Sequence, residues 1–270
     1  MIVAAESCDI IEGIVCTPAS VNELFVFKPI FFIGEMGISR THFLIIFAAI
    51  IVVAFLFFGL RKKSVVPSRI QSMVESLVTL VREDIAMSVI GQGGETYVPY
   101  LLSIFLFILV GNLFEVTPLI NFPITSRMAL PLLLSLITYV LFLFAGIKKQ
   151  GREYFTHLLW PPGLPIALKP LVGFIEFVST LVVRPVSLAI RLFANLVAGH
   201  LMLSLLLVSG YFFIYQNGVW PVPGKIPIGL AWYTFGLAIY GFEIVVSILQ
   251  AYIFTLLSAV YIQTSLHPEH

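Results

Sequence analysis

Residues 181–200 read LVVRPVSLAIRLFANLVAGH, and this stretch places a permanent cation, Arg191, among almost entirely apolar neighbours. Moving an arginine to the centre of a membrane-spanning helix costs roughly 3 kcal/mol on insertion scales. An arginine in such a stretch therefore indicates a partner or a water-filled cavity beside it. The alternative is an arginine whose side chain reaches back to a lipid headgroup, over about one helical turn.

The composition of the whole chain predicts an all-α integral membrane protein. Hydrophobic residues make up 59% of the 270 residues, charged residues only 11%, and the mean hydropathy is +1.04. Such values are typical of polytopic membrane proteins. The net charge of +1 and the lack of a long basic run give no reason to expect nucleic acid as a partner. We expect residues 1–270 to form one polytopic membrane domain.

Five apolar windows are long enough to cross a membrane as helices. The second and third windows form a helical hairpin over 98–147. An odd number of spans puts the two ends of the chain on opposite sides, and basic residues cluster in the segments 61–97 and 148–170. The positive-inside rule then places the N-terminus outside and the C-terminus in the cytoplasm. The five windows are 42–60, 98–117, 129–147, 171–210 and 228–265.

The segment 1–41, before the first span, carries acidic residues and lacks a basic start, which argues against a cleaved signal or transit peptide. It contains both cysteines, Cys8 and Cys16. They could form a disulfide or remain free thiols, because two cysteines do not define a disulfide framework.

The segment between the first two spans predicts an amphipathic helix over 68–90 that lies on the cytoplasmic membrane surface. Pro67 and the glycine-rich turn at 91–94 mark its two ends. Its polar side carries Gln71, Glu75, Arg82 and Glu83. Its apolar side chains recur at helical spacing: Ile70, Met73, Val74, Leu77, Val78 and Val81.

The last two windows are too long for upright spans. Forty helical residues reach about 60 Å, roughly twice the hydrocarbon thickness of a bilayer. Each helix must therefore tilt steeply or break. A kink could occur at Pro185, whereas the fifth window has no proline after Pro227. We expect 171–265 to form a long, steeply tilted antiparallel hairpin.

Polar residues on this hairpin fall into pairs of similar depth. In an antiparallel hairpin, two residues at equal depth have residue numbers whose sum is nearly constant. The residue numbers of His200 and Glu243 add up to nearly the same value as those of Arg191 and Gln250. Both pairs would therefore face each other across a single turn near 220–221. We predict an outer layer with the first pair and an inner layer with the second.

The chemistry of the outer layer favours proton transfer. Histidine and glutamate have ordinary pKa values of about 6.5 and about 4.3, so a pair can pass a proton near neutral pH. Arg191 stays protonated and would block proton passage. Asn112 and Glu115, three residues apart near the outer end of the second span, could line an inlet path, although Glu115 could instead be solvated at the interface. Helical periodicity puts Arg184, Ser187 and Asn195 on the Arg191 face and His200 opposite.

Other classes of membrane protein fit less well. A proton-coupled transporter commonly has an internal repeat, which this sequence does not show. A haem-containing respiratory subunit would need paired histidines, and His200 is the only histidine deep within a predicted span. A zinc site at His200 and Glu243 would need a third ligand. We expect neither a metal nor another cofactor.

Two segments, 184–200 and 243–257, resemble the signature of subunit a of F-type ATP synthase. The resemblance implies a stator beside a ring of small hairpin subunits, each with a buried carboxylate. Arg191 matches the family's essential arginine, and Asn195 and Gln250 match its polar neighbours. Asn112 and Glu115 match an Asn-x-x-acid pair on the inlet side. His200 and Glu243 match a His/Glu couple that many bacterial members carry in exchanged positions.

The resemblance also implies a mechanism and a set of partners. Protons would enter from outside, protonate a ring carboxylate and leave through a cytoplasmic half-path, for which Glu176 is a candidate together with Ser179 and Thr180. Ser187, on the Arg191 face, is a further proton-path candidate. Arg191 would separate the two half-paths. The implied partners are the ring c subunits, the peripheral-stalk b subunits, the rest of the ATP synthase and the lipid bilayer. The chain would not be an enzyme by itself. We expect the chain in a bacterial plasma membrane, with the mitochondrial inner membrane as the alternative.

Overall fold

The computed structural model describes residues 31–33, 36–38, 40–61, 68–117, 120, 124–151, 154, 169–214 and 226–266. The predicted alternatives for Cys8 and Cys16 and the predicted turn near 220–221 lie outside these described residues.

The described part of the chain is mainly helical and contains five helices long and apolar enough to cross a membrane, which confirms the predicted fold class. A helix satisfies its own backbone hydrogen bonds, as a lipid environment requires. The bounds lie within four residues of the apolar windows. In chain order the spans are α2 (Arg40–Leu60), α4 (Val98–Val116), α5 (Ala129–Gln150), the run of α7 (Lys169–Val178), η4 (Ser179–Val183) and α8 (Arg184–Ile214), and α9 (Ile226–Leu266).

A short β-hairpin precedes α2 and was not expected from the sequence. Its strands, β1 (Phe31–Ile33) and β2 (Met36–Ile38), are antiparallel, with Phe31 opposite Ile38. Strands of three residues are too short to show the alternating pattern from which a strand is predicted.

The chain divides into two compact units. The first contains the segments up to Ile46, Gly111–Ser126 and Ala194–Ile248, and the second contains Phe47–Val110, Arg127–Phe193 and the segment from Leu249 onward. The expectation of one polytopic domain stays a prediction.

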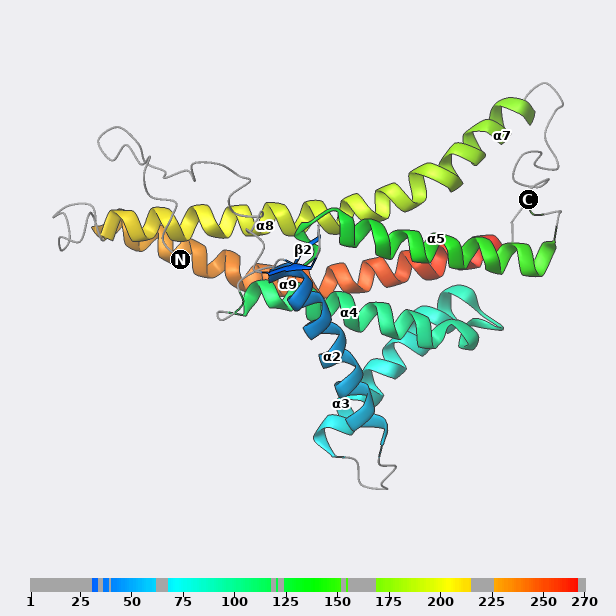
Figure 1. The fold of residues 1–270 in the computed structure, drawn as a ribbon, viewed down its shortest axis with the longest axis horizontal. Coiled ribbons are helices and arrows are strands. Elements are labelled where there is room, and N and C mark those ends of the chain that lie inside the picture. The colour runs from blue at the N-terminus through cyan, green and yellow to red at the C-terminus, as the bar shows by residue number, and fades with distance from the viewer. Residues whose placement is uncertain are drawn as a thin grey trace. The chain divides into compact units, whose positions relative to one another are not determined.

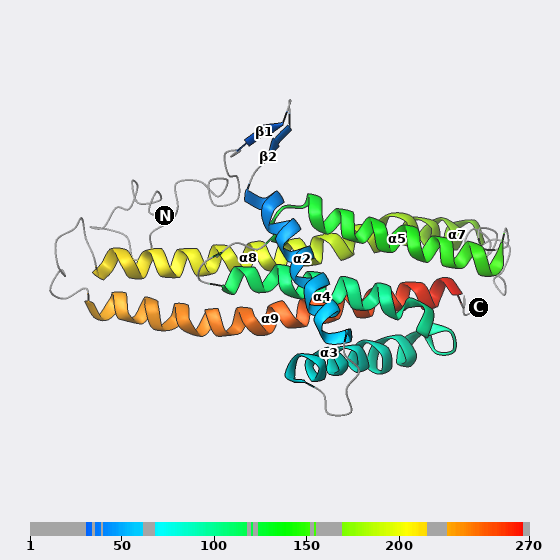
Figure 2. The same cartoon turned by 60° about the horizontal axis from the view of Figure 1, so that its bottom comes forward.

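In the first unit, the end of α8 and the beginning of α9 lie side by side, as both ribbon views show (Figures 1 and 2). Glycines bring the two helices close together. A Cβ added to Gly229 would stand 2.6 Å from Cγ1 of Ile214, and one added to Gly210 would stand 3.1 Å from the ring of Tyr233. These contacts show the antiparallel hairpin that was predicted for this part of the chain.

In the second unit, the amphipathic segment is a helix whose later part is π-helical. It consists of α3 (Arg69–Thr79) and η1 (Leu80–Ile90). Ser68 caps its start by accepting a hydrogen bond from the backbone N–H of Gln71. Gly91, with a φ of 75°, ends it in a conformation that favours glycine. A 3₁₀ turn, η2 (Gly94–Tyr97), then leads into α4. A second 3₁₀ turn, η3 (Ile124–Ser126), belongs to the first unit and precedes α5 along the chain.

One side of the amphipathic segment packs inward and the other is exposed. Val74 is buried against Gly59 of α2, whereas Ile70 and Met73 are 49% and 59% exposed. Exposed apolar residues on such a helix suit the boundary of a bilayer. The position of this helix on a membrane surface stays a prediction.

The fourth span is interrupted immediately before Pro185. Proline lacks an N–H and its ring clashes with the carbonyl four residues earlier, so a regular α-helix cannot continue through it undisturbed. The π-helical segment η4 accommodates this change, and the ribbon changes direction between α7 and the start of α8 (Figure 1). By contrast, α9 runs for 41 residues without a break. The steep tilt of both spans stays a prediction.

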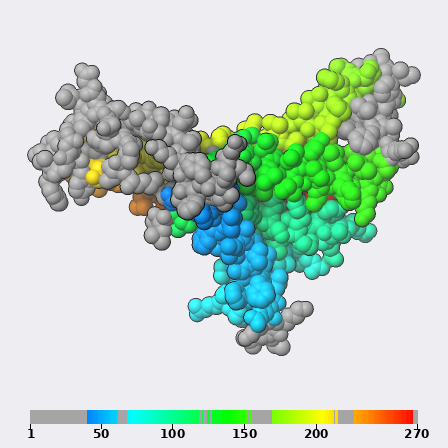
Figure 3. Space-filling model, viewed as in Figure 1, coloured from blue at the N-terminus to red at the C-terminus, as the bar shows by residue number. Residues whose placement is uncertain are grey.

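The surface of α2 is mostly apolar and open. Only 17% of its most apolar window is buried, and the side chains of Phe43, Ile50, Val53 and Phe58 are all more than half exposed. Figure 3 shows this helix as the blue surface. A continuous apolar surface of this kind needs an apolar environment around it.

Candidate functional site

Three ionisable side chains from three helices are buried together in the first unit. Glu115 comes from α4, His200 from α8 and Glu243 from α9, and each residue is at most 4% exposed. Nδ1 of His200 lies 3.7 Å from Oε1 of Glu115. The carboxylate of Glu243 occupies the space where a Cβ of Gly199 would stand, so it lies against the turn of α8 that carries His200.

The polar atoms of this cluster are not all satisfied by protein groups. Among the described residues, neither carboxyl oxygen of Glu115 has a hydrogen-bond partner, and neither does Oε2 of Glu243. Buried oxygens without a partner are costly unless water reaches them. The distance of 3.7 Å between His200 and Glu115 is also longer than a direct hydrogen bond. The arrangement therefore suits a hydrated chain of titratable groups.

Asn112 extends the cluster along α4. It is fully buried, and its Oδ1 accepts a hydrogen bond of 3.0 Å from Thr125. Its Nδ2 has no partner among the described residues. Tyr240 of α9 donates a hydrogen bond to the carbonyl oxygen of Val116, which holds the end of α4 against α9. Thr125 and Tyr240 were not singled out in the sequence, because nothing in their spacing links them to Asn112 or Glu115.

Ser247 is a further buried polar group that the sequence analysis missed. It lies one helical turn after Glu243 on α9, is fully buried, and its hydroxyl has no partner among the described residues. Thr234, Thr255 and Ser258 of the same helix each donate to a carbonyl four residues earlier. Ser247 could have been found from its position four residues after Glu243, which puts both side chains on the same side of the helix.

Arg191 lies on an exposed strip of α8. Asn195 on the same helix is also exposed, and so are the apolar residues Val186 and Ile190. Within the described part of the chain, Arg191 has no hydrogen bond or ion pair. On α8, the cation therefore points outward while His200 is buried. Gln250 of α9 is 2% exposed, and its pairing with Arg191 at equal depth stays a prediction.

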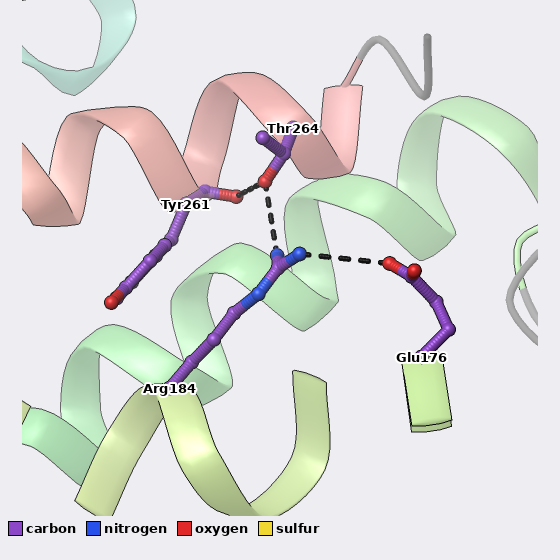
Figure 4. A network of polar contacts seen from close by, with 4 residues as sticks. All are labelled: Glu176, Arg184, Tyr261 and Thr264. Atoms are coloured by element: carbon purple, nitrogen blue, oxygen red, sulfur yellow. Dashed lines mark hydrogen bonds and ion pairs between the residues drawn. The ribbon is translucent and has the colours of Figure 1, made fainter. Parts of the chain in front are cut away.

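Glu176 belongs to a second polar network, which lies in the second unit (Figure 4). Its carboxylate is 3.7 Å from the guanidinium of Arg184. Thr180, one turn later, is 1% exposed, and its hydroxyl has no partner among the described residues. Ser187 is half-buried on α8. Within the described ranges, no group of three or more histidine, cysteine, aspartate or glutamate residues is placed to hold a metal ion.

Comparison with known proteins assigns the family. The model of the family "ATP synthase A chain" matches residues 42–263. The chain is 41% identical to ATP synthase subunit a of Frankia alni over 239 residues, which cover 87% of this chain and 80% of the relative. It is 37% identical to ATP synthase subunit a of Gluconacetobacter diazotrophicus, over 86% of this chain and 90% of the relative. The resemblance of the two signature segments is thus confirmed, and the chain belongs to the ATP synthase A chain family.

Proposed function

We propose that the chain is the proton-conducting stator subunit of a rotary F-type ATP synthase, with two half-paths to a rotor carboxylate that Arg191 separates. Its family makes it a membrane subunit of a proton-translocating ATP synthase and not a nucleotide-binding enzyme by itself. One observation carries the finer proposal. A single helix, α8, presents an outward-facing permanent cation and an inward-facing histidine that contacts a carboxylate.

The buried cluster of the first unit would form the inlet half-path. Protons would enter past Asn112 and move among Glu115, His200 and Glu243, whose unpaired oxygens are suited to water. Histidine can both accept and release a proton near neutral pH, which a relay requires. The last group would pass the proton to the rotor carboxylate.

Arg191 would act on the rotor carboxylate by its charge. A pair of unit charges 4 Å apart attracts by about 4 kcal/mol at an effective dielectric constant of 20. One charge crossing 100 mV supplies about 2.3 kcal/mol. A dry, lasting pair would therefore stop rotation, so water must weaken the contact. Because arginine does not give up its proton, it also prevents direct leak between the half-paths.

The strip around Arg191 supports contact with another helix. Ala194 and Ala198 are exposed on the same side as Arg191 and Asn195. Small residues let helices approach closely in membranes. The helix that approaches would belong to a c subunit of the rotor ring, and Gln250 would flank the contact from α9.

Glu176, Thr180 and Ser187 would lead protons out on the cytoplasmic side. In this arrangement the N-terminus is outside, the C-terminus is cytoplasmic, and the membrane is the bacterial plasma membrane. The further partners would be the peripheral-stalk b subunits and the remainder of the complex.

The test is Arg191→Ala in the assembled enzyme. In inverted vesicles we expect ATP-driven proton pumping to be lost. After removal of the soluble head we expect the passive proton leak to rise. The matched control is Arg69→Ala, which removes an exposed arginine of α3. Normal pumping by the Arg191→Ala enzyme would show that this arginine is structural and would contradict the proposal.

A further inference from the structure

Arg184, the second arginine of α8, is the centre of the network in Figure 4. Its Nη2 lies 3.7 Å from Oε1 of Glu176, and its Nη1 donates a hydrogen bond of 3.1 Å to Oγ1 of Thr264. The guanidinium also lies 5.5 Å from the centre of the Tyr261 ring, within the range of a cation–π interaction. One cation thus joins the carboxylate of α7 to the last turns of α9.

The π-helical segment lies between the two charged residues and affects how they face each other. Residues eight apart in a regular α-helix point about 80° apart around the axis. A π-helical segment turns less per residue, because its hydrogen bonds reach the fifth residue along. The five residues of η4 therefore bring Glu176 and Arg184 closer to the same face than the sequence spacing alone would.

The α9 end of the network is held firmly. The hydroxyl of Thr264 donates to the carbonyl oxygen of Tyr261. The next residue, Ser265, accepts a hydrogen bond of 2.9 Å at its carbonyl oxygen from Gln150 of α5. The Tyr261 ring also packs edge-on against Phe142, 6.0 Å between centroids. Arg184 is therefore anchored on a fixed support.

The Glu176 end is looser. The side chain of Glu176 is 34% exposed, against 21% for Arg184. Their separation of 3.7 Å exceeds that of a charge-assisted hydrogen bond, about 2.7–2.9 Å. Such a distance lets the cation orient the carboxylate while leaving its oxygens accessible to water.

We propose that Arg184 is a positioning residue of the cytoplasmic half-path, which holds the Glu176 carboxylate in place from an anchor on Thr264 and Tyr261. The inference rests on the proposed function, in which Glu176 takes up protons released from the rotor. In this role Arg184 keeps its own proton and does not relay one. It acts through Glu176 alone.

The experiment measures passive proton flux through assembled membrane sectors in inverted vesicles, after the soluble heads are removed. We expect Arg184→Gln to lower the flux about tenfold, and Arg184→Lys, which keeps the charge, to restore most of it. We expect Glu176→Gln to lower the flux similarly. The double variant Arg184→Gln/Glu176→Gln should be no slower than Glu176→Gln alone, because the arginine would have no carboxylate left to position.

Thr264→Val tests the same proposal in a second way. It removes the hydroxyl that anchors Arg184 and leaves the charges of Arg184 and Glu176 in place. It should lower the flux with Glu176 present and leave it unchanged in the Glu176→Gln background. Native gels of the membranes would show whether the Arg184→Gln protein assembles. If it does not, Thr264→Val and Arg184→Lys still test the proposal.

Two results would overturn the inference. If the effects of Arg184→Gln and Glu176→Gln multiply in the double variant, Arg184 is only structural and Glu176 keeps its proposed place. If Glu176→Gln leaves the proton flux unchanged, neither Glu176 nor Arg184 has the proposed role in the cytoplasmic half-path. Neither result bears on Arg191, whose role is decided separately by the pumping and leak of Arg191→Ala.

Discussion

Gly199→Ala should slow proton movement by displacing the carboxylate of Glu243. A Cβ at this position would stand 2.5 Å from Cδ and Oε2 of Glu243, where ordinary contacts begin near 3.4 Å. The carboxylate must therefore move by about 1 Å. A displacement of about 1 Å at a reacting group can cost up to about a hundredfold in rate, so we expect a tenfold to hundredfold loss of proton flux. ATP-driven pumping and passive flux in inverted vesicles would measure it.

Two further variants make this experiment specific. Gly236→Ala also places a methyl group between α8 and α9, but its nearest neighbours would be at 3.4–3.9 Å. It should behave like the unmodified protein. Glu243→Asp shortens the displaced side chain and should partly restore flux in the Gly199→Ala background. Alanine forms helices better than glycine, so a weakened helix would not explain a loss. If Gly199→Ala conducts protons as well as Gly236→Ala, the reasoning about this contact is refuted.

Three other outcomes follow from the described contacts. Thr125→Val removes the hydrogen bond to Asn112 and should reduce ATP-driven pumping by about three- to tenfold, a loss of about 1 kcal/mol, while Thr234→Val on α9 should not. Tyr100→Phe removes the 2.6 Å hydrogen bond to Thr138 and should lower the free energy of unfolding in detergent by about 0.6 kcal/mol, with pumping unaffected. Arg82→Ala should change neither assembly nor pumping between pH 6 and about 8, because the ion pair of Arg82 with Glu95 is solvent-exposed. Glu95 raises the pKa of Arg82, so this arginine stays charged over the whole range. A pH-dependent loss of pumping would contradict this.

The sequence predicted the helical spans well because long apolar windows carry a strong signal. The ends of α2, α4 and α9 follow from where those windows stop. The sequence could not predict the short strands β1 and β2, which are below the length at which a pattern appears. Nor could it predict the π-helical form of η4, although Pro185 marked the position of a disturbance.

Within the candidate site, the residues that sequence reasoning named are those with unusual chemistry in an apolar setting. Glu115, His200 and Glu243 stand out for that reason, and the structure brings them together. The supporting residues are ordinary in composition and act through contacts distant in sequence. Thr125 reaches Asn112 from a separate turn, and Thr264 reaches Arg184 across 80 positions. No periodicity within a single helix could reveal such pairs.

The open apolar surface of α2 has a consequence for the biogenesis of the protein. This helix has neither acidic nor basic residues between His42 and Leu60, so it can partition into the bilayer as soon as it leaves the translocation machinery. The fourth span carries Glu176, Arg184 and Arg191, and each charge near the middle of a helix opposes insertion by about 2.5–3.5 kcal/mol. The later span therefore depends on neighbouring helices for its entry into lipid, and the first span can act as the membrane anchor of the nascent chain while they are synthesised.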